Sequence, residues 1–357
     1  MNPLFVDKPF QDLLDQLKQL PCSDSSESWP AEHLIAMADA GVMTWDIPTD
    51  WNGTELPTAE ILDGLRLLAS ANLTSTFVLT QRSAAVRRIA TSENQIARKR
   101  LLPGLCAGEL FATVGISHLT TSGQHLKKPL VQAKECSDGF ELNGFVPWAT
   151  GVSKADFLVT GGTLPDGQQI LAVVPSDRIG LQVQTPVSLM ALNASQTGAV
   201  RLENVHVRLD EILHGPVQGV MQQGSGGGAG SLGTSTLAMG VTEGALKGIE
   251  AEAAGRPSLS PILKSLQDEH AELLCDLRSC TSGSHPQVTT EGVRQRANSL
   301  VLRSAQAWLA ATKGAGFVSG HPAERAVRES MFFLVWSCPQ PVLDANLQEF
   351  ACSFEGS

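Results

Sequence analysis

The spacing of hydrophobic residues divides the chain into a helical segment, an extended segment and a second helical segment. Up to residue 107, hydrophobic residues recur at intervals of three and four, which is typical of one face of an amphipathic helix. The pattern predicts helices over residues 10–20, 30–43, 58–71, 75–90 and 92–102. Ser92 is expected to cap the last of these helices, and Pro103-Gly104 is expected to end it.

Residues 108–220 have a different pattern, with short runs of β-branched residues separated by turn signals. The runs predict strands over residues 111–116, 129–136, 140–148, 157–160, 170–174 and 199–207. Ser137-Asp138-Gly139, Asn143-Gly144 and Pro165-Asp166-Gly167 are typical of tight turns between strands. Because the strands are short and closely spaced, we expect an antiparallel β-sandwich or barrel.

Helical spacing returns after a glycine-rich stretch at residues 224–230. This stretch follows no predicted strand and lacks the acidic residue of a dinucleotide-binding fold, so we interpret it as a linker. Helices are predicted over residues 234–254, 260–278, 291–313, 322–335 and 342–351, which form an antiparallel bundle. The predicted class is therefore α+β multidomain, with an N-terminal helical domain (1–107), a central β domain (108–220) and a C-terminal four-helix bundle (221–357).

Composition and charge exclude several classes of function. The chain has 357 residues and a formal net charge of −10, with no basic run, so a nucleic-acid partner is not expected. No run of 18 hydrophobic residues predicts a membrane span, and residues 1–19 lack the hydrophobic core of a signal peptide. Seven cysteines without a C-x-x-C pair indicate reduced thiols in a cytoplasmic protein, and no metal site is predicted.

Five motifs occur in the order in which they occur in the acyl-CoA dehydrogenases, and the chain resembles that family over nearly its whole length. The motifs are Ile47-Pro48-x-x-Trp51-x-Gly53, Leu102-Pro103-Gly104-Leu105-x-x-Gly108-Glu109, Leu202-Glu203-Asn204-Val205-x-Val207-x-x-Asp210-x-Ile212-Leu213-x-Gly215, Lys313-Gly314-Ala315-Gly316-Phe317 and Pro322-x-Glu324-Arg325-x-x-Arg328-Glu329. The resemblance implies the acyl-CoA dehydrogenase fold, an FAD cofactor (with FMN as an alternative), a homodimer or homotetramer, and oxidation of an acyl thioester or related small molecule.

The resemblance also implies residues that contact the flavin ring. A flavin needs a hydrophobic wall on one face and hydrogen-bonding groups at its edge. Trp148 and Thr150 match the strand that supplies the wall and a hydroxyl in the family, and Ser117 matches a hydroxyl at the pyrimidine edge. The alternative interpretation of Trp148 is a half-buried tryptophan of the β domain.

Further positions correspond to the dinucleotide half of the cofactor, which the family binds across a subunit interface. Arg256 and Gln267 have the spacing of the family's arginine and glutamine, but Leu259 and Ser260 replace its Phe and Gly. The alternative for Arg256 is a solvated arginine at a turn. Gly314 and Gly316 match glycines whose backbone amides approach the phosphates, although a helix end has the same sequence pattern.

The family's catalytic base is missing. Ser337 stands where the resemblance places a glutamate, and Gly230 and Ser231 stand where some relatives have a base and an arginine. A serine hydroxyl cannot abstract a proton at neutral pH without a base of its own. Three interpretations remain open: a desaturase with another base such as Glu329 or Asp344, a flavin-dependent monooxygenase of the same fold, and a non-catalytic flavin binder.

Two further residues near these positions have both a functional and a structural interpretation. His118 replaces the family's glutamate beside the flavin-edge hydroxyl and could orient or protonate an oxygenated intermediate, or it could be an ordinary polar loop residue. Cys338 follows Ser337 and could present a thiol to the pocket, or it could be a buried, inert cysteine.

Overall fold

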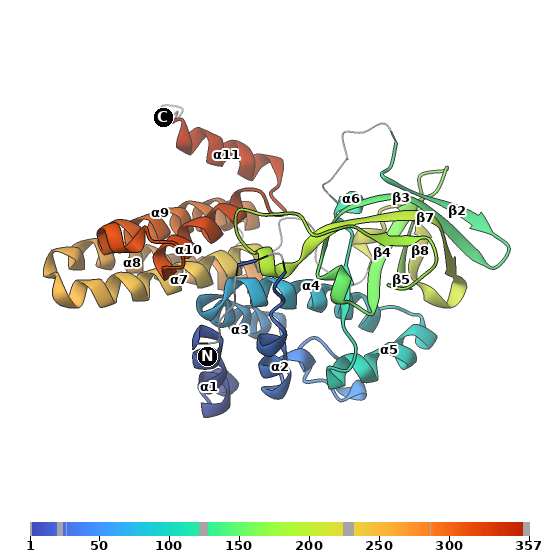
Figure 1. Cartoon of the computed structure of the whole chain (residues 1–357), viewed down its shortest axis with the longest axis horizontal. Coiled ribbons are helices and arrows are strands. Elements are labelled where there is room, and N and C mark those ends of the chain that lie inside the picture. The colour runs from blue at the N-terminus through green and yellow to red at the C-terminus, as the bar shows by residue number, and fades with distance from the viewer. Residues whose placement is uncertain are drawn as a thin grey trace. The chain divides into compact units, whose positions relative to one another are not determined.

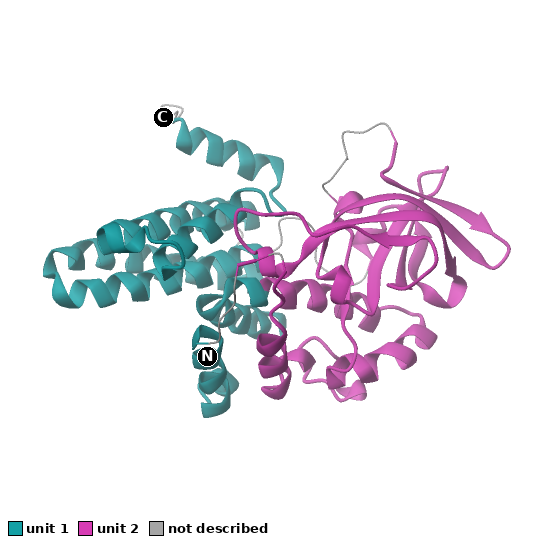
Figure 2. Cartoon of the chain, viewed as in Figure 1, with its two compact units in different colours: residues 1–19, 57–76, 229–357 teal, residues 20–56, 77–228 magenta. Residues whose placement is uncertain are grey.

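The computed structural model describes residues 2–19, 24–25, 27–120, 128–223, 232–285 and 287–352. The chain folds into two compact units (Figure 2). Unit 1 comprises residues 1–19, 57–76 and 229–357, and unit 2 comprises residues 20–56 and 77–228. The predicted linker at residues 224–230 and the positions Gly230 and Ser231 lie outside the described residues.

Unit 1 is helical, and its helices follow the predicted segments closely. They are α1 (Lys8–Gln19), α3 (Thr58–Ala71), α7 (Leu232–Gly255), α8 (Ser260–Ser282), α9 (Thr290–Gly316), α10 (Pro322–Met331) and α11 (Gln340–Phe350), with short 3-10 turns η1 (Pro3–Phe5), η8 (Pro257–Leu259) and η9 (Phe332–Leu334). The helices α7, α8 and α9 lie side by side (Figure 1), and α3 also packs against α7. Because α7 is covered by several helices, its residues from Thr234 to Thr242 are all buried.

Small residues allow α7 to approach its neighbours closely. A Cβ atom added to Gly240 would lie 2.3 Å from the carbonyl oxygen of Arg66 on α3. A Cβ atom added to Gly248 would lie 2.0 Å from the Trp308 ring on α9. The bundle therefore depends on the absence of side chains at these two positions.

Unit 2 is built on one eight-stranded sheet. Its strands are β1 (Ala112–Val114), β2 (Val131–Cys136), β3 (Gly139–Thr150), β4 (Phe157–Thr163), β5 (Gln169–Pro175), β6 (Leu181–Val183), β7 (Thr197–Arg208) and β8 (Ile212–Val217). The order is β6-β7-β3-β2-β4-β5-β8, with β1 paired to β4. The longest pairing is the antiparallel one between β3 and β7.

The predicted fold class is confirmed, because along the chain helical N-terminal and C-terminal regions precede and follow a central sheet. The sheet is mixed, because β1 and β2 each pair with β4 in parallel, whereas the sequence predicted an antiparallel arrangement. The sequence pattern also missed β6, which has only three residues, and β8, which has six.

Helices α2 (Ala31–Asp39), α5 (Gln95–Ala107) and the larger part of α4 (Leu73–Ala90) belong to unit 2, together with 3-10 turns η2 (Val42–Thr44), η3 (Thr49–Trp51), η4 (Val152–Lys154), η5 (Asn193–Ser195), η6 (Leu209–Glu211) and η7 (Val220–Gln222). One mixed core joins α4 and α5 to strands β1, β4 and β5. A second core lies between residues of β2, β3, β4, β5 and β7. None of the described helices combines the length and hydrophobicity needed to cross a bilayer.

Two predicted features of α5 were wrong. Its N-cap is Asn94, whose side chain accepts hydrogen bonds from Ile96 and Ala97, whereas the Ser92 hydroxyl donates to the carbonyl of Leu213 at 2.6 Å. The helix also continues through Pro103 and ends at Gly108, which has a φ of 73°. Glycine adopts this left-handed conformation without strain and so forms the helix end.

We expect Gly240→Ala to destabilise the protein, because the new methyl group would collide with the backbone of α3. Overpacking of this kind costs about 1–3 kcal/mol of unfolding free energy. Gly255→Ala is the matched control, since it lies at the end of the same helix with no atom within 4 Å of the added Cβ. Urea unfolding of both variants measures the effect, and an unchanged midpoint for Gly240→Ala would contradict the close packing.

Candidate active site

The predicted ring-binding residues of unit 2 lie on neighbouring segments. Strand β1 leads through Gly115 into the short helix α6 (Ser117–Thr120), which packs against β3. The Thr113 hydroxyl donates to the carbonyl of Thr150 at 2.7 Å and so ties β1 to the end of β3. A Cβ atom on Gly115 would lie 2.8 Å from Val146 Cγ1, so a glycine is needed where α6 meets β3.

Trp148 lies in a β-bulge of β3. The β3–β7 register shifts between Val146, which pairs with Val200, and Ala149, which pairs with Gly198. Pro147 within this interval has no N–H to donate to a neighbouring strand. The bulge changes the alternation of the strand, so Ala149 is buried and the Trp148 side chain is 49% exposed. A large aromatic surface is thereby left uncovered in unit 2.

Two adjacent polar atoms on α6 are buried without a hydrogen-bond partner among the described residues. They are Ser117 Oγ and His118 Nδ1. The other ring nitrogen, His118 Nε2, lies 2.9 Å from the carbonyl oxygen of Gly161 on β4. Since a carbonyl only accepts, Nε2 carries the proton and Nδ1 is left as an acceptor. Burial lowers the pKa of His118 to about 4, so at neutral pH the ring is uncharged.

Thr150 is positioned differently from Trp148. Its side chain is buried, and its hydroxyl lies 2.9 Å from the hydroxyl of Thr197 on β7. Thr197 in turn lies 2.8 Å from the Ser195 hydroxyl. The Thr150 hydroxyl thus belongs to a buried chain of three hydroxyl groups that links β3 to the start of β7.

The predicted dinucleotide-binding residues all lie in unit 1. Arg256, at the end of α7, donates through Nη2 to the Glu252 carboxylate and to the carbonyl of Ala311 on α9. These two contacts tie the guanidinium to its own bundle. Gln267 is half-buried on α8.

The two glycines at the end of α9 differ in their surroundings. Gly314 is exposed, and a Cβ atom there would have no neighbour within 4 Å. Gly316 is buried, and a Cβ atom there would lie 1.8 Å from Thr312 Oγ1. Packing alone therefore requires glycine at position 316. Position 314 accepts a side chain, so its glycine has no steric explanation in unit 1.

Ser337 lies in a loop between η9 and α11 that is held by a buried arginine. Ser337 itself is half-buried with a φ of 48°. Arg294 on α9 is fully buried and donates through Nη2 to the carbonyls of Phe333 and Trp336, both at 2.9 Å. Burial lowers the pKa of Arg294 to about 10 and raises the pKa of the neighbouring Cys338 thiol. The Cys338 thiol is therefore protonated at neutral pH and is a poor nucleophile.

Sequence analysis missed Arg294, although a charged residue among Val293, Ala297 and Val301 of one helix signals a buried partner. Its Nε donates to Asn298 Oδ1 at 2.9 Å, and Asn298 also donates to the Phe333 carbonyl. The pair fixes the backbone just before Ser337. The loop that carries Ser337, the residue predicted to stand at the family's base position, is therefore held by hydrogen bonds from α9.

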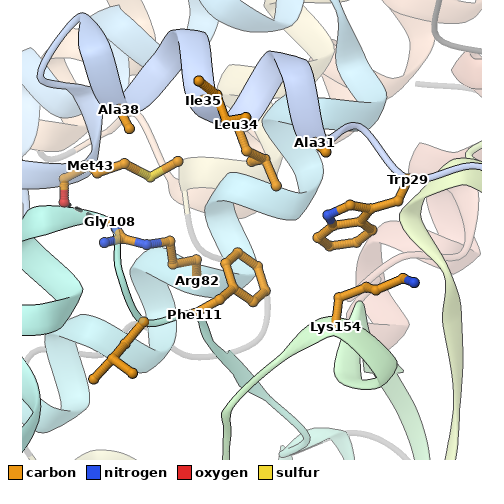
Figure 3. Close-up of a pocket in the computed structure, with 11 residues that line it drawn as sticks. Trp29, Ala31, Leu34, Ile35, Ala38, Met43, Arg82, Gly108, Phe111 and Lys154 are labelled. Carbon is orange, nitrogen blue, oxygen red and sulfur yellow. Dashed lines mark hydrogen bonds between the residues drawn. The ribbon is translucent and has the colours of Figure 1, made fainter.

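A second buried arginine, Arg82, lines a cavity of about 230 Å³ in unit 2 (Figure 3). The cavity lies between α2, the start of β1 and η4, and its walls include Trp29, Phe111 and Lys154. Arg82 donates to the carbonyls of Met43 and Leu105, and burial lowers its pKa to about 10. Because its guanidinium already joins two backbone segments, Arg82 holds the wall of this cavity together.

The chain is similar in sequence to two curated proteins. It is 24% identical over 253 residues to a probable acyl-CoA dehydrogenase of Bacillus subtilis, YngJ, over 68% of this chain and 66% of that protein. It is 27% identical over 139 residues to a dibenzothiophene monooxygenase of Mycolicibacterium goodii, over 35% of this chain and 33% of that protein. The matches span less than two thirds of either relative, and no family model matches the chain.

Solved structures share the fold over nearly the whole chain. The prolyl acyl carrier protein oxidase AnaB has a TM-score of 0.80 at 17% identity, with 98% of this chain and 99% of that chain covered. A glutaryl-coenzyme A dehydrogenase in complex with glutaryl-CoA has a TM-score of 0.79 at 16% identity, with 97% and 96% covered. The fold is therefore that of the acyl-CoA dehydrogenases.

We expect His118→Gln to reduce the pH dependence of stability. Between pH 4 and 6.5 the unfolded chain binds a proton at His118 and the folded protein does not, so the unfolding free energy falls as the pH is lowered through this interval. At pH 5 the loss is on the order of 1–2 kcal/mol. Glutamine retains a donor for Gly161 but does not titrate.

Urea unfolding at pH 7.5 and pH 5 tests this expectation. The wild type should lose more stability between the two pH values than His118→Gln does. His270→Gln serves as a comparison, because His270 is a buried histidine of unit 1 whose pKa is also lowered by burial. Equal losses in the wild type and in His118→Gln would show that His118 titrates normally in the folded protein.

Proposed function

We propose that this member of the acyl-CoA dehydrogenase superfamily is a flavin-dependent oxidoreductase acting on a small molecule. One observation carries the proposal. Trp148 is exposed on β3, the strand against which α6 packs, and on α6 Ser117 Oγ and His118 Nδ1 are buried without a hydrogen-bond partner among the described residues. A hydrophobic plane together with unsatisfied edge groups suits a planar heterocycle that has its own donors and acceptors.

The residues of unit 2 fit a flavin in three respects. Trp148 supplies a wall for one face of the ring, which aromatic stacking stabilises. The Ser117 hydroxyl donates or accepts a hydrogen bond at the ring edge, and the neutral His118 accepts one. A bound flavin, FAD or FMN, supplies the two-electron chemistry of the reaction. The protein's part is to hold and orient the ring and to keep water from its face.

The first candidate reaction is oxidation of an acyl thioester or a related small molecule. The similarity to the probable acyl-CoA dehydrogenase of Bacillus subtilis supports it. This reaction requires removal of a proton next to the thioester carbonyl, and Ser337 has no carboxylate to accept it. A desaturase of this kind therefore uses another base, such as Glu329 or Asp344, or it is slow.

The second candidate is oxygenation by reduced flavin, and two observations favour it. The sequence match to dibenzothiophene monooxygenase is one, and the absence of a carboxylate at position 337 is the other. Oxygenation of an aromatic or sulfur compound does not require a base that removes a proton from carbon. A non-catalytic flavin binder is the third possibility and is distinguished by inactivity in both assays.

We also propose a homodimer or homotetramer in the cytoplasm. In such an assembly, Arg256 and Gln267 reach the dinucleotide half of a neighbouring subunit's cofactor, with help from the backbone at Gly314. Arginine suits this role because its planar fork binds phosphate oxygens in pairs. The cysteines among the described residues are all free thiols, in keeping with a reducing compartment.

Trp148→Ala should weaken flavin binding, because it removes the wall against which the ring stacks. Stacking contributes about 0.5–1.5 kcal/mol beyond area burial, which corresponds to a rise of roughly twofold to tenfold in the flavin dissociation constant. Fluorescence titration of the apoprotein with FAD and with FMN measures both constants. Phe145→Ala is the matched control, since Phe145 is also exposed on β3 but lies outside the bulge. Equal affinities for both variants would remove Trp148 from the flavin site.

Ser337→Glu should raise the rate at which acyl-CoAs reduce the bound flavin, since a placed base contributes about 10²–10⁴-fold. Anaerobic bleaching of the flavin measures this rate, and Ser337→Gln controls for size without basicity. Rapid bleaching of the wild type would mean that another base serves the reaction. If none of the three proteins responds, the oxygenase interpretation is tested next. The protein is supplied with reduced flavin and labelled molecular oxygen, and incorporation of the label into a product is measured.

A further inference from the structure

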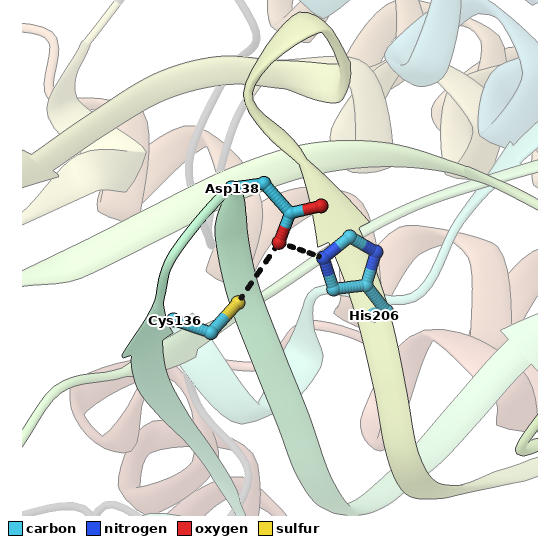
Figure 4. Close-up of side chains that lie close together, drawn as sticks. All are labelled: Cys136, Asp138 and His206. Atoms are coloured by element: carbon cyan, nitrogen blue, oxygen red, sulfur yellow. Dashed lines mark hydrogen bonds and ion pairs between the residues drawn. The ribbon is translucent and has the colours of Figure 1, made fainter.

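The turn between β2 and β3 brings three metal-ligating side chains to one end of the sheet. Cys136 is the last residue of β2 and pairs with Gly139, the first residue of β3. Asp138 lies in the turn between them, and His206 lies on β7, opposite Glu141 of β3. The side chains of Cys136, Asp138 and His206 converge above the strands (Figure 4).

The donor atoms of the three side chains are close enough to share one ion. Asp138 Oδ1 lies 3.0 Å from His206 Nε2 and 3.9 Å from Cys136 Sγ, and all three donor atoms lie within 4.8 Å of one another. Tetrahedral zinc, with bonds of about 2.0–2.3 Å, separates its ligand atoms by about 3.3–3.8 Å. Because Cys136 and Asp138 are exposed and His206 is half-buried, we expect rotations of these side chains to bring their donor atoms to this geometry.

The set of donors selects the kind of metal. A thiolate, an imidazole and a carboxylate are zinc ligands, whereas calcium and magnesium prefer oxygen atoms alone. The backbone supports the arrangement, because two of the three residues lie on paired strands and the third lies in a two-residue turn. Among the described residues, no other group of His, Cys, Asp and Glu side chains brings three donors this close.

The surrounding charges are compatible with a cation. Glu141 on β3 pairs with His206 on β7 and with Lys134 on β2, so the row of residues that contains His206 holds one negative and one positive side chain. Arg208 is turned toward Asp210, to which it donates twice, at 2.8 and 3.1 Å. The nearest arginine of β7 is thus already neutralised.

We propose that Cys136, Asp138 and His206 form a zinc site that links the β2–β3 turn to β7. Zinc has three protein ligands there, and because Cys136 and Asp138 are exposed, a water molecule or an exogenous ligand completes the coordination. The site lies outside the residues proposed to bind flavin. Its expected effect is to fix the end of the β3–β7 pair.

Zinc titration of the purified, chelator-treated full-length protein tests the proposal. Equilibrium dialysis with elemental analysis should give one tightly held zinc per chain. Cys136→Ser, Asp138→Asn and His206→Gln should each raise the dissociation constant by at least about tenfold, since even second-shell changes cost about 10–100-fold. Cys275→Ser, at another exposed cysteine, should leave zinc binding unchanged.

Protection of the thiol gives a second, site-resolved measurement. Zinc should slow alkylation of Cys136 by iodoacetamide, while the exposed thiols of Cys275 and Cys352 should react at unchanged rates. Mass spectrometry of the peptides measures each rate, and the protection should vanish in His206→Gln. Unchanged alkylation of Cys136 at saturating zinc, or equal zinc affinity in the wild type and the three ligand variants, would overturn the proposal.

Discussion

The antiparallel pairing of β3 with β7 is the interaction on which both proposed sites of unit 2 depend. Near one end, the shift in register between Val146 and Ala149 exposes Trp148. At the other end, the same pair holds Gly139 against Arg208 and thereby sets His206 beside the β2–β3 turn. Trp148 lies nine positions after Gly139 along β3, or roughly 30 Å at the usual rise per residue. A change of register would displace both sites at once, because it moves every side chain of the strand to the other face.

Hydrophobic spacing predicted the helices well, because a helix that buries one face must repeat that face every three to four residues. Residues 58–71 form α3 as predicted, and the bundle helices differ from prediction only near their ends. The strands were predicted less fully. Strand β6 is too short to show an alternation, and the parallel pairings with β4 connect segments whose partners no local pattern identifies.

The features of the sites were harder to predict than the elements that carry them. The motif containing Trp148 was evident, but its exposure results from a bulge, and a bulge depends on the pairing of two distant strands. Arg294 gave a local signal, but the carbonyls that it binds are about 40 residues away and became visible only in the folded bundle. Cys136 and His206 are 70 residues apart, so their proximity required the register of β7.

The buried hydroxyls of Thr150, Thr197 and Ser195 have a consequence for how unit 2 meets a ligand. Each hydroxyl has a single proton to donate, so the three must point the same way along the chain. When Thr150 donates to Thr197, only its lone pairs remain for a neighbour; when the order is reversed, its proton becomes available. The two orders are mutually exclusive, and hydrogen-bonded groups polarise one another, so the three protons must reorient together. A ligand that accepts a hydrogen bond from Thr150, or donates one to it, would therefore also change the direction of the hydrogen bond between Thr197 and Ser195.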